Sequence, residues 1–125
     1  MVAILHNIRS LHNVGSIFRT ADGAGVEKLY LCGITPSPLD RFGTVRSDVA
    51  KTALGAEKTV PFEIFKSTSR LIDKLKKDGY KIIALELDKR AVAYYTPYAI
   101  RYTLGKVALI VGAEVVGIPK TILDK

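Results

Sequence analysis

The chain has 125 residues, the length of one compact domain, so we expect a single domain over residues 1–125 and no separate substrate domain. No apolar run approaches the ~20 residues that span a bilayer, and the N-terminus lacks the basic and apolar regions of a signal peptide. These features favour a soluble cytoplasmic protein without a membrane partner. Nineteen Lys and Arg against twelve Asp and Glu give a net charge of +7. This excess favours a polyanion such as RNA as a partner, although a basic solvated surface gives the same composition.

Short apolar runs alternate with stretches of helical spacing along the chain. In order, the sequence predicts a strand at 2–5, a helix over 13–24 ended by Gly25, a strand at 28–32, a helix before residue 54, a helix that begins after Ser67 or Thr68 and stops at 78–79, and strands at 81–87 and 107–111. This alternation predicts an α/β fold, with a parallel sheet that carries helices on both faces.

Glycine-rich phosphate loops and metal clusters, two common features of α/β proteins, are missing from the sequence. The run Gly23-Ala24-Gly25 lacks a third glycine and lies at a predicted helix end, and the run 55–59 lacks the glycine that precedes the lysine of a phosphate-binding loop. His6 and His12 do not have metal-ligand spacing, and Cys32 has no second cysteine to pair with. We therefore expect neither a dinucleotide site nor a metal.

A first candidate motif covers residues 7–22, Asn-Ile-Arg-Ser-Leu-His-Asn-Val-Gly-Ser-Ile-Phe-Arg-Thr-Ala-Asp, directly after the first predicted strand. On local chemistry alone, Asn13 caps a helix and Arg19 lies on its solvated face. The segment also resembles motif 1 of the SpoU (TrmH-like) RNA 2'-O-ribose methyltransferases of the SPOUT superfamily, and residues 51–57 resemble the Gly-Ala run that follows it. This resemblance implies that Asn13 and Arg19 lie beside the centre of methyl transfer.

A second candidate motif covers residues 108–118, where a predicted strand runs into a loop flanked by Gly112 and Gly117. On local chemistry alone, the strand ends in a turn and Glu114 is an exposed turn residue. The segment also resembles motif 2 of the same family. There the resemblance implies that the backbone of Gly112 approaches the adenosine of S-adenosylmethionine, and that Glu114 helps to build the active site.

The resemblance also implies the reaction. SpoU enzymes are dimers that transfer the methyl group of S-adenosylmethionine to a ribose 2'-hydroxyl of tRNA or rRNA. The implied catalytic residues are Asn13, Arg19 and Glu114. The implied cofactor contacts are Leu85, Val111 and Gly112. We expect RNA phosphates to contact four cationic residues near this site, for which a solvated basic surface is the alternative: Arg9, Arg41, Arg46 and Lys51.

The role of Arg19 follows from its chemistry. The mechanism proposed for the family makes the matching arginine the base that removes the ribose proton. A guanidinium with a pKa above ~12 is poorly suited to that task. We therefore expect Arg19 to orient the ribose and its phosphate and to stabilise developing negative charge, with Asn13 and Glu114 holding its geometry.

The sequence departs from the family pattern in two places. Ala113 stands where the family usually has Asn, and no segment resembles the Ser-Leu-Asn motif 3, since the sequence ends at Lys125 soon after Gly117. We therefore expect a domain that is incomplete at its C-terminus and lacks the knot-forming segment. A catalytically inactive RNA-binding or dimerisation module derived from such an enzyme is the alternative function. A third is an unrelated small α/β binding protein.

Overall fold

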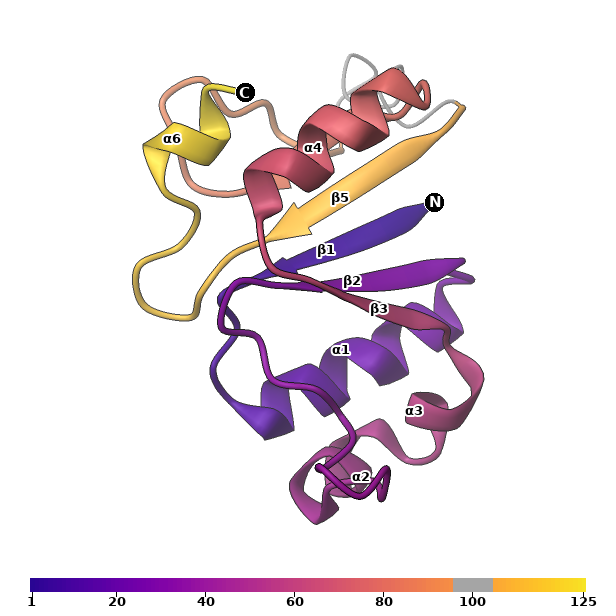
Figure 1. Cartoon of the computed structure of the whole chain (residues 1–125). Coiled ribbons are helices and arrows are strands. Elements are labelled where there is room, and N and C mark those ends of the chain that lie inside the picture. Colours follow the sequence, from indigo (N-terminus) through magenta and orange to yellow (C-terminus); the bar gives the residue numbers. More distant parts are fainter. Residues whose placement is uncertain (96–104) are drawn as a thin grey trace.

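The computed structural model describes residues 1–95 and 105–125 and has a parallel sheet at its centre (Figure 1). Its strands are β1 (Val2–His6), β2 (Lys28–Cys32), β3 (Phe62–Phe65), β4 (Lys81–Leu85) and β5 (Val107–Val111). Within the described residues the sheet has five strands in the order β3-β2-β1-β5-β4, and all neighbouring pairs are parallel. The predicted α/β class and parallel sheet are therefore confirmed.

Helices cover both faces of this sheet. They are α1 (Leu11–Gly23), α2 (Ser47–Ala53), α3 (Ala56–Thr59), α4 (Thr68–Lys77) and α6 (Lys120–Leu123). In Figure 1, α1, α2 and α3 lie on one side of the sheet, and α4 and α6 lie on the other. None of these described helices is long and apolar enough to cross a membrane.

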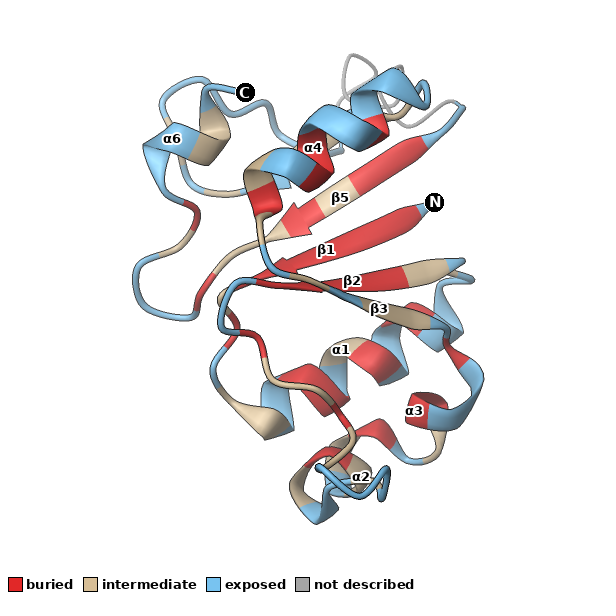
Figure 2. Ribbon diagram, viewed as in Figure 1, coloured by how far each residue is buried: buried red, intermediate tan, exposed pale blue. Residues whose placement is uncertain are grey.

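The central strand β1 contributes to two cores. All of its residues are buried, because it lies in the middle of the sheet between two helical layers. Ala3 and Leu5 pack into the core that contains α1, whereas Val2 and Ile4 pack into the core that contains α4. A continuous apolar run is what a strand covered on both faces requires. Figure 2 shows this burial on β1, β2, β5 and the inward sides of α1 and α4.

Several predicted boundaries were wrong. Helix α1 begins at Leu11, because the Ser10 hydroxyl caps it by accepting a hydrogen bond from the Asn13 N–H (3.2 Å). Asn13 therefore lies in the first turn and is not the cap. Strand β4 ends at Leu85 rather than at residue 87, and the sequence prediction missed β3, α3 and α6. Strand β3 is short and half-exposed at the sheet edge, so it lacks the dense apolar pattern of the other strands.

The α1 side of the sheet is not covered evenly. Ile83 and Leu85 of β4 pair in register with Leu109 and Val111 of β5, so the four side chains share one face. Leu85 is 62% exposed, and Ile83 and Leu109 are only half-buried. Val111 packs against the core that α1 builds, and the other three side chains continue the apolar face toward the β4 edge.

Candidate functional site

The strand order places the two motifs beside each other. Parallel strands end at one edge of the sheet, and β1 neighbours β5, so the loop after β1 lies next to the loop after β5. The chain moves from β1 to β2 and β3 on one side, and the strands on the other side are β5 and β4. Ligands of open α/β sheets bind where the strand order reverses in this way. In this sheet that point lies between the β1 and β5 loops.

The Glu114 carboxylate joins the two loops. Its Oε1 accepts a hydrogen bond from Nδ2 of Asn13 (2.8 Å) and one from the Ser10 N–H (3.3 Å), and its Oε2 accepts one from the Arg9 N–H (3.3 Å). An anion is favoured at this point because the first N–H groups of α1 have no partner inside the helix. The structure therefore brings together Asn13 of the first motif and Glu114 of the second.

The same contacts change the acidity of Glu114. Desolvation raises the pKa of this carboxyl group, but the hydrogen bonds from Asn13 and from backbone N–H groups outweigh it and lower the pKa to about 2, from an ordinary value of 4.5. Hydrogen bonds to the charged form of an acid have this effect. At neutral pH Glu114 is thus a fixed negative charge and not a proton acceptor.

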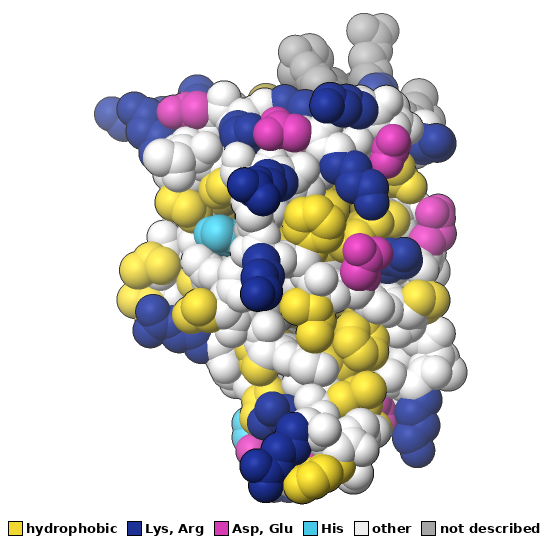
Figure 3. Space-filling view, in the orientation of Figure 1, with side chains coloured by type: hydrophobic (Ala, Val, Ile, Leu, Met, Phe, Trp, Pro, Cys, Tyr) yellow, Lys and Arg dark blue, Asp and Glu magenta, His cyan; other side chains and the backbone are white. Residues whose placement is uncertain are grey.

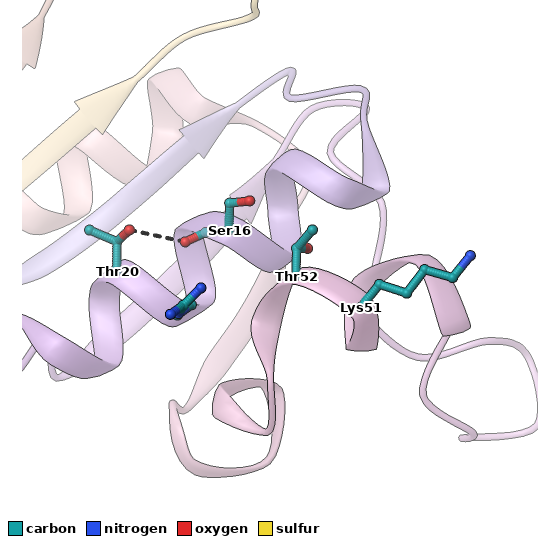
Figure 4. A pocket seen from close by; sticks show the side chains of 5 residues that line it. Ser16, Thr20, Lys51 and Thr52 are labelled. Atoms are coloured by element: carbon teal, nitrogen blue, oxygen red, sulfur yellow. Dashed lines mark hydrogen bonds between the residues drawn. The ribbon is translucent and has the colours of Figure 1, made fainter.

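Arg19 lies apart from this pair, in a pocket between α1 and α2. Figure 4 shows the pocket, which has a volume of about 460 Å³ and is lined by Ser16, Arg19, Thr20, Lys51 and Thr52. The three hydroxyl groups donate to backbone carbonyls of α1 or α2, so within the pocket the cationic side chains are the remaining donors. Within the described residues the exposed Arg19 side chain makes no hydrogen bond or ion pair, so its guanidinium is free to bind an anion.

The expectation that Asn13 and Glu114 hold the geometry of Arg19 stays a prediction, and the structure shows the route by which they could do so. Both residues contact the start of α1 rather than the Arg19 side chain, and they fix the helix from which Arg19 extends. Arg19 follows further along α1 and lies on a different side of the helix, toward α2.

The four cations that the sequence suggested for RNA are all exposed and occupy two places. Arg9 lies in the loop after β1, next to Glu114. Arg41 and Arg46 lie in the segment before α2, and Lys51 lies on α2, where it forms an ion pair with Asp48 (3.2 Å) and lines the Arg19 pocket. Lys51 is thus the one of the four that the structure places with Arg19.

Known proteins share this arrangement over the whole chain. The SpoU rRNA Methylase family matches residues 1–125. The chain belongs to the SpoU family. A Staphylococcus haemolyticus protein named as a TrmH family tRNA/rRNA methyltransferase is 32% identical over 124 residues, a match that covers 99% of this chain and 45% of that protein. The SpoU chain thus spans less than half the length of this relative.

Solved structures show the same fold. An rRNA methyltransferase from Sinorhizobium meliloti has a TM-score of 0.81 at 26% identity, covering 98% of this chain and 43% of that one. The SpoU methyltransferase AviRb from Streptomyces viridochromogenes, crystallised in complex with the cofactor AdoMet, has a TM-score of 0.79 at 15% identity, covering 99% of this chain and 47% of that one. The SPOUT-like fold predicted from the two motifs is therefore confirmed.

The residues that the SpoU resemblance assigned to the cofactor lie at the ends of β4 and β5. Leu85 and Val111 are register partners, exposed and half-buried respectively, and Gly112 follows Val111. A Cβ atom on Gly112 would lie 2.6 Å from the carbonyl carbon of Gly117 and 2.7 Å from the N atom of Ile118. The motif 2 loop thus folds back on itself at Gly112, and this close approach already requires glycine there.

Glu86, which sequence reasoning did not select, closes this loop from the β4 side. Its Oε2 accepts a hydrogen bond from the Ile118 N–H (2.7 Å) and its Oε1 accepts one from the Leu87 N–H (2.8 Å). These backbone N–H groups lower the pKa of Glu86. The only available signal was an acidic residue directly after a predicted strand, which is too common to identify a partner elsewhere in the chain.

A polar network of Asn7, His6 and Thr68 supports the start of the motif 1 loop. The Nδ2 group of Asn7 donates to Nε2 of His6 (3.2 Å), and Nδ1 of His6 lies 2.7 Å from Oγ1 of Thr68. The Ile34 N–H donates to Oδ1 of Asn7 (3.1 Å), which fixes the orientation of the amide. His6 therefore accepts at Nε2 and carries its proton on Nδ1. Burial lowers the pKa of His6.

Proposed function

We propose that this SpoU chain transfers the methyl group of S-adenosylmethionine to a ribose 2'-hydroxyl of tRNA or rRNA. The observation that carries the proposal is the Glu114 carboxylate, which joins the motif 2 loop to the start of the motif 1 helix at the point where the strand order reverses. The basic pocket around Arg19 and Lys51 begins on that same helix. This arrangement supports a cofactor edge beside an RNA-binding surface.

The ends of β4 and β5 fit the adenosyl part of S-adenosylmethionine. Leu85 and Val111 offer adjacent apolar side chains, and the tight Gly112 turn leaves backbone groups beside them. Ligand sites of this kind combine apolar walls with a few polar backbone groups. The bound cofactor supplies an activated methyl group on a sulfonium, which needs alignment with the ribose oxygen more than it needs further activation.

Arg19 is the residue that we assign to the ribose and its phosphate. Its guanidinium binds phosphate and stabilises the oxygen that becomes negative during transfer. Lys51 adds a second cation to the same pocket. Asn13 and Glu114 act at a distance, by holding the start of α1.

Other parts of the proposal concern assembly and location. We propose a homodimer that works in the cytoplasm, with RNA as its partner. The apolar side chains exposed at the site edge, Leu85 and Val115 among them, support a surface that another molecule covers. Sedimentation equilibrium gives the oligomeric state directly.

An inactive RNA-binding or dimerisation module remains the second candidate, and one observation favours it. Leu85 is 62% exposed and Leu109 is only half-buried, so the apolar wall for a cofactor is open to solvent on one side. Calorimetric titration with S-adenosylmethionine separates the two functions, since an RNA-binding module without the cofactor releases no heat of binding.

The test of the proposed function is methyl transfer from S-adenosylmethionine with a labelled methyl group to tRNA or rRNA. Methylation of the 2'-oxygen leaves the adjacent phosphodiester resistant to alkali, which distinguishes it from methylation of a base. Arg19→Ala should lower the rate by at least ~10²-fold, the effect expected for loss of one preorganised donor. Arg70→Ala, an exposed arginine on α4 across the sheet, is the matched control.

Cofactor binding provides the second measurement. Arg19→Ala should leave the affinity for S-adenosylmethionine unchanged, because Arg19 lies away from β4 and β5. A near-normal rate in Arg19→Ala, or a label that alkali fails to retain in dinucleotides, would reject the proposed assignment.

A further inference from the structure

A small hairpin between β2 and α2 has no role in the site described so far. Leu39 and Val45 form an antiparallel bridge, and the Asp40 N–H donates to the carbonyl oxygen of Thr44 (2.8 Å). The Asp40 carboxylate accepts hydrogen bonds from the Phe42 N–H (2.8 Å) and the Thr44 N–H (2.9 Å). We call this segment the 39–45 hairpin. Its backbone is fixed although its tip projects into solvent.

The tip of the 39–45 hairpin presents an aromatic ring. Phe42 is 76% exposed, so its burial does not explain its presence. The guanidinium carbon of Arg41 lies 4.7 Å from the centre of the Phe42 ring, within the range of a cation–π contact. A phenylalanine and an arginine thus form a stacked pair on a rigid support, and the pair leaves ring surface free.

The 39–45 hairpin is connected to the Arg19 pocket by a short, fixed link. Arg46 follows it directly: its N–H donates to the Pro38 carbonyl (2.9 Å) and its Nε donates to the Leu39 carbonyl (3.3 Å). Helix α2 begins at the next residue and carries Lys51 into the pocket. Figure 3 shows Lys and Arg side chains beside hydrophobic ones at the lower end of the molecule, where Figure 1 places α2.

The charge around this pair selects the class of partner. Arg41 at the tip and Arg46 at the base carry positive charge, whereas the Asp40 carboxylate is occupied by backbone N–H groups of its own hairpin. The nearby Asp48 is paired with Lys51. An exposed aromatic ring beside arginines is the arrangement that stacks unpaired bases while cations bind the backbone phosphates. The two arginines beside the ring therefore favour a polyanion such as RNA as the occupant.

We propose that the 39–45 hairpin is a stacking platform for one unpaired base of the RNA, next to the nucleotide whose phosphate binds Arg19. The inference rests on the proposed function, since it concerns a neighbour of the modified nucleotide. It gives Arg41 a role beyond a phosphate contact, because its guanidinium lies over the ring while its N–H groups stay available to phosphate. The hairpin then selects sites in which the flanking base is unpaired.

Fluorescence titration with a short single-stranded oligoribonucleotide that carries 2-aminopurine tests this platform, because stacking quenches the probe. Phe42→Leu keeps apolar bulk and removes the aromatic face, so it should weaken RNA binding by about 5- to 150-fold and abolish the quenching. Phe42→Trp should restore both. Ile64→Thr, which changes an exposed apolar side chain on β3, is the matched control and should bind like the wild type.

Salt dependence separates stacking from charge. Phe42→Leu should leave the slope of log affinity against log salt unchanged, whereas Arg46→Gln should make the slope shallower by removing a phosphate contact. Arg41→Lys keeps the charge but loses the planar stack, so it should weaken binding at an unchanged slope.

Three results would overturn the platform. Phe42→Leu that binds and quenches like the wild type would reject stacking and leave the proposed function intact. A chain that fails to bind the oligonucleotide at all would reject the platform directly. Concentration-dependent self-association that Phe42→Leu abolishes would assign the ring to a protein contact. Stacking that persists in a chain without methyl transfer would instead uphold the platform and reject the proposed function alone.

Discussion

The central strand β1 and the edge strand β4 have similar apolar sequences but serve different purposes. All residues of β1 are buried, whereas none of the residues of β4 is fully buried. Both strands are rich in Ile, Leu and Ala, so composition does not explain the contrast. Position does, because β1 lies between two helical layers and β4 lies at an edge beyond the reach of the α1 core. We infer that the part of the sheet around β1 supplies stability, and that the edge at β4 supplies surface for ligands.

The largest test of this contrast compares one leucine from each strand. Leu5→Ala should destabilise the fold by ~2–5 kcal/mol, because Leu5 is completely buried and its truncation leaves a cavity. Leu85→Ala should change stability by less than ~0.5 kcal/mol, because the side chain is already mostly in water. Urea unfolding followed by circular dichroism measures both. Equal losses would mean that β4 is covered in solution and that the two strands do not differ.

A second test compares two glycines of α1. A Cβ atom on Gly15 would lie 2.5 Å from the carbonyl oxygen of Val49 and 3.1 Å from the N atom of Ala53, so α1 and α2 approach closely there. Gly15→Ala should therefore cost ~1–3 kcal/mol by separating the helices, and it should disturb the Arg19 pocket. Gly23 has open space around the same position, so Gly23→Ala should stabilise the chain by at most ~1 kcal/mol. Thermal unfolding of the two variants measures both changes in stability. A Gly15→Ala variant that is more stable than the wild type would contradict the close contact between α1 and α2.

Glu114 links the loop after β5 to the start of α1, and its charge makes this link sensitive to acid. Its pKa in the folded chain is about 2, below the ordinary value of 4.5, so its contribution to stability is complete above pH 4.5 and is lost as the pH falls toward 2. Glu114→Gln lacks this contribution at every pH. The difference in melting temperature between the wild type and the variant should therefore shrink over that interval. A difference that stays constant from pH 6 to pH 2 would show that the carboxylate is not held as described.

The smallest expected effect is at His6, the buried residue that ends β1. Burial lowers the pKa of His6 below its ordinary value of 6.5, so the unfolded chain takes up this proton first as the pH falls. Stability linked to His6 is thus complete above pH 6.5 and declines below it. His6→Gln should flatten the dependence of the melting temperature on pH in this interval. An unchanged slope would mean that the imidazole is accessible to water when the chain is folded.

The sequence predicted the parts of the fold in which local chemistry and burial agree. Strands such as Lys28–Cys32 and Val107–Val111 were predicted at their observed bounds, because continuous apolar runs between polar residues have few alternatives. Phe62–Phe65 was missed because an edge strand does not need such a run, and Glu63 and the preceding Pro61 look like a loop. Similarly, Ser10 and Asn13 are both good caps in sequence, and the structure shows that Ser10 caps α1 while the Asn13 side chain binds Glu114.

The candidate site was predictable to the same degree. The two motifs selected Asn13 and Glu114, and the structure adds that their side chains meet across neighbouring loops. They were not sufficient to place Arg19, whose surroundings depend on how α2 packs against α1. The bond between Glu86 and the Ile118 N–H joins distant parts of the chain and involves a backbone donor, which leaves no trace in residue type.

The pairing of β1 with β5 also determines the order in which parts of the sheet can form during synthesis. The ribosome releases β1, α1 and β2 early, and these elements can pack locally, yet one edge of β1 has its partner only after β5 has been made. Pairing between distant segments is slow, and an apolar strand edge promotes aggregation as long as it stays unpaired. The nascent chain is therefore most vulnerable just before β5 emerges, and faster synthesis of β5 shortens the time during which this edge of β1 is exposed.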